Sequence, residues 1–191
     1  MPSLPRAFYL RPARAVARDL LGCVLVSRRG RASTAGRIVE TEAYLGPEDA
    51  ASHAAFRPGS HWLFYGEGGL AYVFLNYGTH HCLNAIAGAA GAPGCVLIRA
   101  LEPVIGHAVM ARRRGVAPAA RRLASGPGNL TRALAVTLRD NGADLTRGPL
   151  TIEPAPDRRR FRIATGPRIG ITRSADLPLR FWIAGNPFVS R

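Results

Sequence analysis

Glu40, Glu42 and Tyr44 are the residues of this sequence whose types and spacing are best suited to chemistry. They belong to a run, residues 37–49, that reads as a β-strand closed by the turn Gly46-Pro47. Because side chains alternate between the faces of a strand, these three point to one side. Carboxylates beside an aromatic ring suit a pocket that holds a flat molecule and carries out proton chemistry next to it. A half-exposed sheet face with solvated glutamates would give the same pattern, so this run alone does not decide the matter.

The sequence is strongly and unevenly basic. It carries 26 basic and 12 acidic side chains, a formal net charge of +14, and its basic residues other than histidine are all arginine. Residues 1–95 hold nine arginines against six acids, and residues 96–191 hold seventeen against six. Arginine presents a planar fork that grips phosphate through two hydrogen bonds. A biased base composition could explain arginine in place of lysine but not the sign of the charge. A polyanion is therefore the expected partner, with nucleic acid ahead of a membrane surface.

Length and composition predict one domain, residues 1–191, with a core of its own. The chain is 47% hydrophobic and only 20% charged, which excludes a disordered polycation. Its three cysteines lie in apolar, strand-like contexts and form no close pairs, which favours a reducing compartment over a disulfide framework. The first residues lack the apolar stretch of a signal peptide, and no segment is apolar enough to span a membrane. We expect an intracellular, cytoplasmic protein that associates with DNA and not with membranes.

The order of elements predicts an α+β fold with a mixed or antiparallel sheet and short helices. Two strands, residues 70–77 and 81–87, are joined around Tyr77-Gly78-Thr79 and read as a hairpin. Residues 50–69 read as irregular. Asn129 is expected to cap a short helix. The other elements are predicted from periodicity and turn residues: helices over 13–21 and 104–114, and strands over 23–27, 95–100, 150–153, 158–165 and 179–184.

The hairpin carries aromatic residues with two possible uses. Tyr77 at the tip of a basic protein's hairpin could act as a wedge between base pairs, or could simply cap the hairpin's own packing. Phe74 points to the opposite face from Tyr77 and could be ordinary core. In a base-binding site it could instead form one plate of a stacking sandwich with Tyr44, where a base–aromatic contact contributes about 1–3 kcal/mol.

Two turns are further candidates for phosphate binding, and one cluster of histidine and cysteine residues is a candidate for metal binding. The turns at residues 125–129 and 166–170 could each present backbone N–H groups to a phosphate, although many helix starts look similar. His80, His81 and Cys82 match no standard zinc spacing, and adjacent histidines on a strand point to opposite faces. We therefore expect no metal site.

Several motifs in the right order resemble the alkyladenine (3-methyladenine) DNA glycosylase family, the methylpurine glycosylases. The resemblance extends from about Leu20 to the end of the sequence. The motifs that carry it are residues 37–49, His53, residues 72–78, 82–84, 95–103 and 125–127, and the closing segments 178–182 and 185–190.

The resemblance implies a single α+β domain that works as a monomer, without a metal or an organic cofactor, on double-stranded DNA containing damaged purines. Its protruding β-hairpin would enter the minor groove. Glu42 matches the catalytic glutamate, which activates the water that attacks C1′ of the flipped nucleotide, and Arg99 matches a buried arginine beside it. Tyr77 matches the intercalating tyrosine.

The resemblance also assigns the base pocket and the DNA-backbone contacts. The residues that match the base pocket are Tyr44, His53, Phe74 and Asn84. Asn84 matches the residue that crowds the 2-amino group of guanine and so rejects normal guanine. The residues that match DNA-backbone contacts are Ser125, Gly126, Gly128, Asn129, Arg168 and Gly170.

This sequence departs from the family pattern at several positions. Phe74 stands where a second stacking tyrosine is usual, Thr79 replaces a common methionine, and residues 53–66 lack the expected arginine/threonine/asparagine pattern. Two alternatives stay open: a DNA-binding protein of this fold that has lost catalysis, and a glycoside hydrolase that uses Glu40 and Glu42 as its carboxylate pair.

Overall fold

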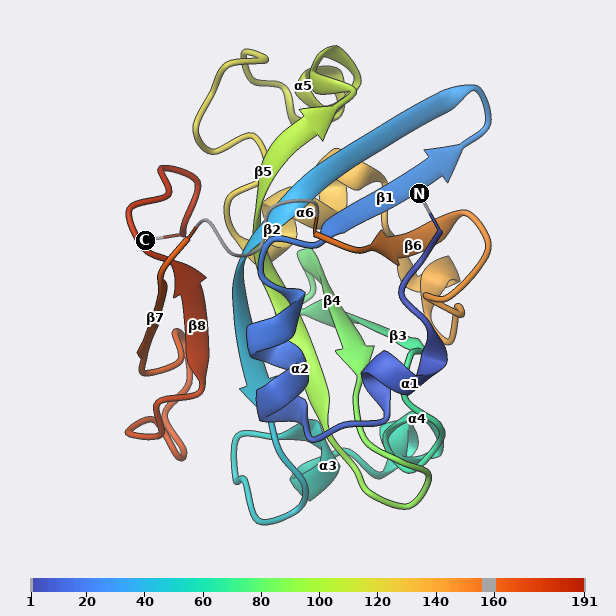
Figure 1. The fold of residues 1–191 in the computed structure, drawn as a ribbon, viewed down its shortest axis with the longest axis vertical. Coiled ribbons are helices and arrows are strands. Elements are labelled where there is room, and N and C mark those ends of the chain that lie inside the picture. Colours follow the sequence, from blue (N-terminus) through green and yellow to red (C-terminus); the bar gives the residue numbers. More distant parts are fainter. Residues whose placement is uncertain (1, 156–160, 191) are drawn as a thin grey trace.

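The fold is organised around β2 (Ala32–Tyr44), the strand that carries the candidate glutamates. A computed structural model of the protein describes residues 2–155 and 161–190 (Figure 1). All the strand pairs in this part of the chain are antiparallel. β5 runs along one edge of β2, and the other edge is shared by β1 and β8. The fold is therefore α+β with an antiparallel sheet, as the sequence predicts.

The main path of the sheet is β3-β4-β5-β2-β1-β6, with β8 paired to β2 and β7 paired to β8. The other strands are β1 (Val24–Arg29), β3 (Ala71–Asn76), β4 (His80–Ile86), β5 (Cys95–Ile105), β6 (Leu150–Glu153), β7 (Ile163–Gly166) and β8 (Arg180–Ile183). The helices are α1 (Arg6–Tyr9), α2 (Ala13–Leu20), α3 (His53–Phe56), α4 (His61–Phe64), α5 (His107–Arg114) and α6 (Pro127–Leu134), with 3-10 turns η1 (Pro58–Ser60) and η2 (Leu138–Asp140).

Helix α2 covers one face of β2, in front of the strand in Figure 1. The hydroxyl of Thr41 donates a hydrogen bond of 2.8 Å to the carbonyl of Ala17 in this helix. Because side chains alternate along a strand, Glu40 and Glu42 point to the opposite face. Both glutamates are nevertheless fully buried. The sheet therefore positions two carboxylates in its interior, on the side away from α2.

Two groups of buried apolar side chains fill the structure. The larger joins α2, α6 and the central strands, and its most buried members include Leu20, Ile38, Ile98 and Phe181. The smaller lies beneath the ends of β2 and β3, where Tyr44 and Phe74 pack against it. The two aromatic residues are therefore supported from behind by close-packed side chains.

The predicted hairpin is present as β3 and β4. Asn76 pairs with His80, and the amide of Thr79 donates to the carbonyl of Asn76 across the turn. Tyr77 and Gly78 both have positive φ, the conformation that tight hairpin turns require. The side chain of Tyr77 is 87% exposed at this tip, so it does not cap the packing of its own hairpin.

The structure corrects three predicted elements. Val104 and Ile105 belong to β5, and α5 begins only at His107, because Gly106 at φ 82° ends the strand. Asn129 is not the N-cap of α6, because Gly126 occupies that position. The side-chain amide of Asn129 donates to the Ser125 carbonyl instead. Residues 50–69 contain α3, η1 and α4 rather than irregular chain alone.

Most of the other predicted elements are confirmed to within a few residues. Of the strand predicted over 158–165, residues 158–160 lie outside the described residues, and the observed strand β7 runs from Ile163 to Gly166.

Replacing Gly106 by alanine tests the junction between β5 and α5. A Cβ there would lie 2.6 Å from the carbonyl oxygen of Ser33, whereas one at Gly30 would meet nothing within 4 Å. Both glycines have positive φ, so alanine at either position carries a backbone strain of roughly 1–2 kcal/mol. We expect Gly106→Ala to lower the free energy of unfolding by about 1–3 kcal/mol more than Gly30→Ala. Urea denaturation measures the free energy of unfolding of both variants. Equal decreases in the two variants would contradict the close contact at Gly106.

Candidate functional site

One cavity of about 790 Å³ lies at the ends of β2, β3 and β4, beside the start of α6. It is open on one side, and its walls come from the strands β2, β3, β4 and β5, from the helices α3, α4 and α6, and from the loop after β7. The predicted site residues that line it are Tyr44, His53, Phe74, Tyr77, Asn84, Arg99 and Gly170. Residues far apart in the sequence therefore meet at this cavity.

Glu42 lies directly behind the cavity wall. Its Oε1 accepts a hydrogen bond of 2.8 Å from the amide of Ile169 and lies 3.2 Å from Nη1 of Arg99. Its Oε2 accepts a hydrogen bond of 3.0 Å from the hydroxyl of Tyr44. All three partners line the cavity, while Glu42 itself is fully buried. The carboxylate is thus fixed in one orientation at the edge of the cavity.

Burial raises the pKa of Glu42 above its ordinary value, and nearby Glu40 adds to this. The positive charge of Arg99 and the hydrogen bonds from Ile169 and Tyr44 oppose the shift. A carboxylate with a raised pKa that is still held by donors can accept a proton more readily than a solvated glutamate.

Glu40 has a different environment from Glu42. Its Oε1 accepts from Nε of Arg180 at 2.7 Å and lies 3.3 Å from Nε of Arg99, and its Oε2 accepts from the amide of Ser190 at 2.7 Å. Glu40 does not line the cavity. Arg99 therefore bridges two buried carboxylates. Glu42 has three cavity-lining partners, Arg99, Tyr44 and Ile169, whereas Arg99 is the one cavity-lining partner of Glu40 among the described residues. This arrangement disfavours the glycosidase interpretation, because Glu40 is held by Arg180, Arg99 and the amide of Ser190.

The aromatic walls are formed by side chains on three elements. Tyr44 ends β2, Phe74 lies in β3, and the ring of His53 in α3 lies 4.5 Å from the ring of Phe74, centroid to centroid. Burial lowers the pKa of His53 to about 4, and the charge of Arg57 contributes to the same shift. His53 is therefore neutral near pH 7, so its ring has one donor nitrogen and one acceptor nitrogen but carries no charge.

Sequence reasoning missed Tyr72 as part of this site. Its hydroxyl lies 2.8 Å from Nδ1 of His53 and 3.1 Å from Oγ of Ser60, and it accepts from Arg57 at 3.5 Å. Tyr72 also lines the cavity. The signal was available, since strand alternation puts Tyr72 on the same face as Phe74.

Asn84 is almost fully buried in β4, opposite Tyr72 of β3. Its side-chain amide donates a hydrogen bond of 3.1 Å to the carbonyl oxygen of Tyr72, which fixes the direction of the side chain. Asn84 is therefore a rigid part of the cavity wall rather than an adaptable one.

Arg168 does not face solvent, which corrects its assignment as a DNA-backbone contact. Its guanidinium pairs with both carboxylate oxygens of Asp49, at 2.6 and 2.8 Å, and neither side chain is exposed. It also donates to the carbonyls of Ala43 and Ser174 and lies 4.6 Å from the centroid of the Tyr44 ring. A buried guanidinium with these partners cannot reach a phosphate. It supports Tyr44 from the side away from the cavity, since Arg168 is not among the lining residues.

Burial tends to raise the pKa of Asp49, but the hydrogen bonds from Arg168 and from the amides of Leu45 and Ala51 outweigh it. The result is a pKa below the ordinary value for aspartate. Asp49 therefore remains charged, and the pair with Arg168 stays intact at neutral pH.

The turn at the start of α6 packs against the hairpin near its tip, at the first residue of β4. Pro127 lines the cavity, and a Cβ on Gly128 would lie 2.9 Å from the side chain of His80. Gly126 has a φ of 94°, and Asn129 donates to Ser125 at 2.6 Å. Ser125, Gly126, Gly128 and Asn129 are thus brought to one side of the hairpin.

Residues 2–155 and 161–190 contain no group of three His, Cys, Asp or Glu side chains placed to hold a metal ion. Within the same ranges, no helix has the length and apolar character needed to cross a membrane.

Comparison with known proteins agrees with the resemblance seen in the motifs. Residues 7–187 match the sequence model of the methylpurine-DNA glycosylase family. A relative from Koribacter versatilis is 50% identical over 197 residues, covering 98% of this chain and 92% of the relative. One from Methanoculleus marisnigri is 47% identical over 192 residues, covering 99% of each. Both relatives are provisionally named 3-methyladenine DNA glycosylases.

Replacing Arg168 by methionine tests its structural role. Because the change leaves Asp49 buried without its partner, we expect the free energy of unfolding to fall by about 3–5 kcal/mol. The double variant Arg168→Met/Asp49→Asn removes the unpaired charge and should be less destabilised than the single variant.

The pH dependence of stability provides an independent check. The folded-state pKa of Asp49 is lowered, so the carboxylate stabilises the wild type above its unfolded pKa, and this stabilisation is lost as the pH falls. Urea denaturation should show that the difference in free energy of unfolding between wild type and Arg168→Met becomes smaller below about pH 4. A difference in free energy of unfolding that does not change with pH would contradict the pairing. A double variant that is less stable than the single variant would contradict it too.

Proposed function

Because this chain belongs to the methylpurine-DNA glycosylase family, we propose that it flips damaged purines out of duplex DNA and hydrolyses their N-glycosidic bonds. The product is an abasic site. The observation that carries this proposal is the fixed Glu42 carboxylate beside an aromatic cavity large enough for a purine. The proposed enzyme acts as a monomer without a cofactor.

The proposed role of Glu42 is general base. A carboxylate has about four acceptor positions on its two oxygens. Among the described residues, Oε1 is engaged by both Ile169 and Arg99, whereas Oε2 has only the hydroxyl of Tyr44. Oε2 is therefore the oxygen that can accept a hydrogen bond from a water and take its proton as that water attacks C1′. Such general-base assistance is worth about 10²–10⁴-fold in rate.

The flipped base would lie between Tyr44 and Phe74. Base–aromatic stacking contributes about 1–3 kcal/mol per base and does not need the hydroxyl that Phe74 lacks. Damaged purines pair or stack less well than normal ones, so flipping them costs less. Purines of the 3-methyladenine, 7-methylguanine, hypoxanthine and ethenoadenine class are the proposed substrates. Asn84, rigidly held by the backbone of Tyr72, would crowd the 2-amino group of guanine.

The DNA-binding elements are proposed to surround the cavity. Tyr77, exposed at the hairpin tip, would fill the gap left by the flipped nucleotide. The turn of Ser125, Gly126, Gly128 and Asn129 would contact the DNA backbone through its N–H groups. The net charge of +14 supports a polyanionic partner.

The proposed reaction uses water rather than an enzyme nucleophile. Glycosylases that also cut the strand attack C1′ with an amine to form a Schiff base, and this sequence has no lysine. Cys82 lines the cavity, but burial raises its pKa to about 11, so it remains an un-ionised thiol. A monofunctional glycosylase is therefore the better proposal.

Replacing Glu42 by glutamine tests the proposed base. The amide keeps the shape of the side chain but cannot take a proton, so the single-turnover excision rate should fall at least about 10²-fold. Affinity for the damaged duplex should remain within a fewfold of wild type. The matched variant is Glu40→Gln, which changes the other buried carboxylate. An active Glu42→Gln alongside an inactive Glu40→Gln would overturn the assignment, and a wild type that binds without excising would favour the catalytically impaired binding protein.

Replacing Tyr44 by phenylalanine separates stacking from the hydrogen bond to Glu42. The hydroxyl lowers the pKa of Glu42, so its loss should raise that pKa further. Because the base must be ionised, excision falls as the pH drops through this pKa, and the acid limb of the rate profile should move to higher pH in Tyr44→Phe. Binding of the damaged duplex should change little, since the ring is retained. An unshifted profile combined with weakened binding would contradict this role.

A further inference from the structure

Beyond these roles, we propose that Arg173 binds a phosphate of the flipped nucleotide, and that it does so only when the base occupies the cavity. This inference rests on the proposed function and adds a positioning residue that the sequence analysis did not identify. It rests on three features of Arg173: its place in the cavity wall, its unpaired charge and the anchoring of its loop.

Arg173 is the cavity's one free cation among the described lining residues. The lining residues that carry a positive charge are Arg99 and Arg173, since His53 is neutral. Arg99 is buried and engaged by both Glu40 and Glu42. Arg173 is exposed, and no hydrogen bond or ion pair joins it to another residue that the structure describes. Its guanidinium is therefore available to a ligand at the mouth of the cavity.

The loop that carries Arg173 is anchored on both sides of it. On one side, the amide of Ile169 donates to Glu42 at 2.8 Å. On the other, the carbonyl of Ser174 accepts from the buried Arg168 at 3.2 Å. Between these anchors, residues 169–173 all line the cavity. Arg173 is thus presented at a fixed place relative to the proposed base, so less ordering is needed when a ligand binds.

The chemistry of a flipped nucleotide places an anion at this position. The base can enter an aromatic cavity, but its phosphates cannot follow, because burying an unpaired charge is costly. They remain at the mouth, where the planar fork of an arginine matches two phosphate oxygens. The start of α6 also contributes to the cavity wall, through Pro127. Arg173 and this turn would then hold the backbone from separate sides.

A contact made at the cavity wall depends on flipping. An arginine elsewhere on the surface would contact the backbone of damaged and undamaged DNA alike, whereas Arg173 would meet a phosphate only in the flipped state. Its loss should therefore weaken binding to damaged duplex selectively. General electrostatic attraction would not produce that difference.

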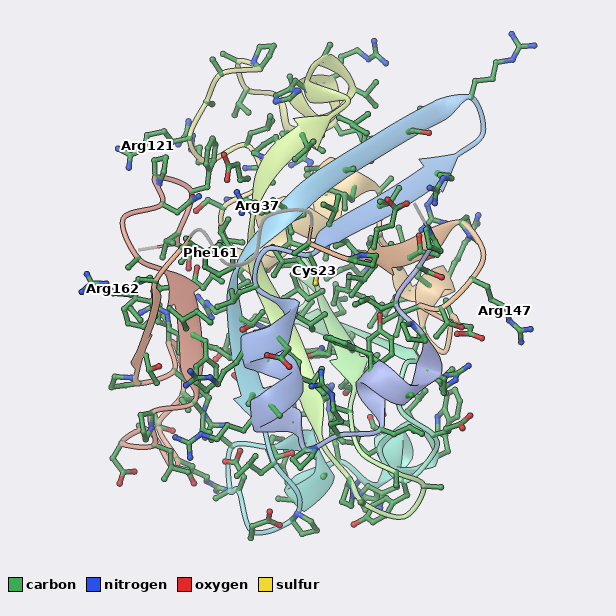
Figure 2. All side chains as sticks on the ribbon, viewed as in Figure 1. Cys23, Arg37, Arg121, Arg147, Phe161 and Arg162 are labelled. Carbon is green, nitrogen blue, oxygen red and sulfur yellow. The ribbon has the colours of Figure 1, made fainter. Side chains whose placement is uncertain are left out.

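The test uses Arg173→Ala in the full-length protein, with Arg147→Ala as the matched control. Arg147 has a side chain that is 83% exposed, pairs with Asp144, and lies across the molecule from β7 and β8 (Figure 2). Both variants are measured in the Glu42→Gln background by fluorescence anisotropy, on a duplex containing one ethenoadenine and on the same duplex undamaged. We expect Arg173→Ala to lose about tenfold to a hundredfold in affinity for the damaged duplex only, the range for hydrogen bonds to a charged group. Arg147→Ala should change both affinities equally or not at all.

A second arm identifies the phosphate. A single neutral methylphosphonate is placed in turn at each phosphate flanking the lesion. If Arg173 binds one of them, neutralising that phosphate should weaken the background protein but have no further effect in Arg173→Ala. The inference would be overturned if the losses of affinity from the methylphosphonate and from Arg173→Ala were additive at every position. It would also be overturned if Arg173→Ala lost affinity equally for damaged and undamaged duplex. Thermal denaturation confirms that the variant is folded.

Failure of this inference is distinguishable from failure of the proposed function. A wild type that neither excises damaged purines nor prefers damaged duplex removes the proposed function and this inference with it. A wild type that excises normally, together with an Arg173→Ala variant that binds damaged duplex as tightly as its background, removes only the role of Arg173.

Discussion

Two carboxylates buried side by side on the central strand are the constraint on which the site depends. A buried charge is tolerated only when it is paired and hydrogen-bonded, so Glu40 and Glu42 require donors from other parts of the chain. Arg99 comes from β5, Arg180 from β8, the amide of Ile169 from the loop after β7 and the amide of Ser190 from the last residues that the structure describes. Satisfying the two glutamates thus brings together segments more than a hundred residues apart. Two of these partners, Arg99 and Ile169, also line the cavity.

The two glutamates differ because of how they are paired. Glu40 is held by Arg180, by Arg99 and by a backbone amide, and no cavity-lining group other than Arg99 contacts it. Glu42 shares Arg99 but has the hydroxyl of Tyr44 as its second side-chain partner. Burial raises the pKa of Glu42, although the charge of Arg99 and the hydrogen bonds from Ile169 and Tyr44 oppose the shift. Glu42 is therefore the carboxylate that we propose for proton transfer, and Glu40 the one that we propose serves structure.

A second ion pair supports the aromatic wall. Arg168 and Asp49 are both fully buried, and their guanidinium–carboxylate pair packs against Tyr44 on the side away from the cavity. The same arginine holds the carbonyls of Ala43 and Ser174, so it ties the end of β2 to the loop that carries Ile169 and Arg173. The stacking surface, the carboxylate and the proposed phosphate contact are consequently positioned by one rigid group of side chains.

The sequence by itself determined most of the elements and the family to which the chain belongs. Alternation along residues 37–49 put Glu40, Glu42 and Tyr44 on one face, and the turn Tyr77-Gly78 set the tip of the hairpin, because both signals are local. Family motifs identified Glu42, Tyr44 and Asn84, all of which the structure places at the cavity or next to it.

Only the tertiary structure decided which arginines are paired with a buried carboxylate and which are exposed to a ligand. An arginine reads the same in a sequence whether it meets a carboxylate or solvent, so the motif gave Arg168 a phosphate contact that its buried pair with Asp49 prevents. Arg173, five residues later, is the one left exposed at the cavity wall. Tyr72 was missed for a related reason: its hydroxyl acquires a role only because folding brings His53, Ser60 and Arg57 around it. Partners that decide charge and hydrogen bonding are distant in the chain, and no local pattern encodes them.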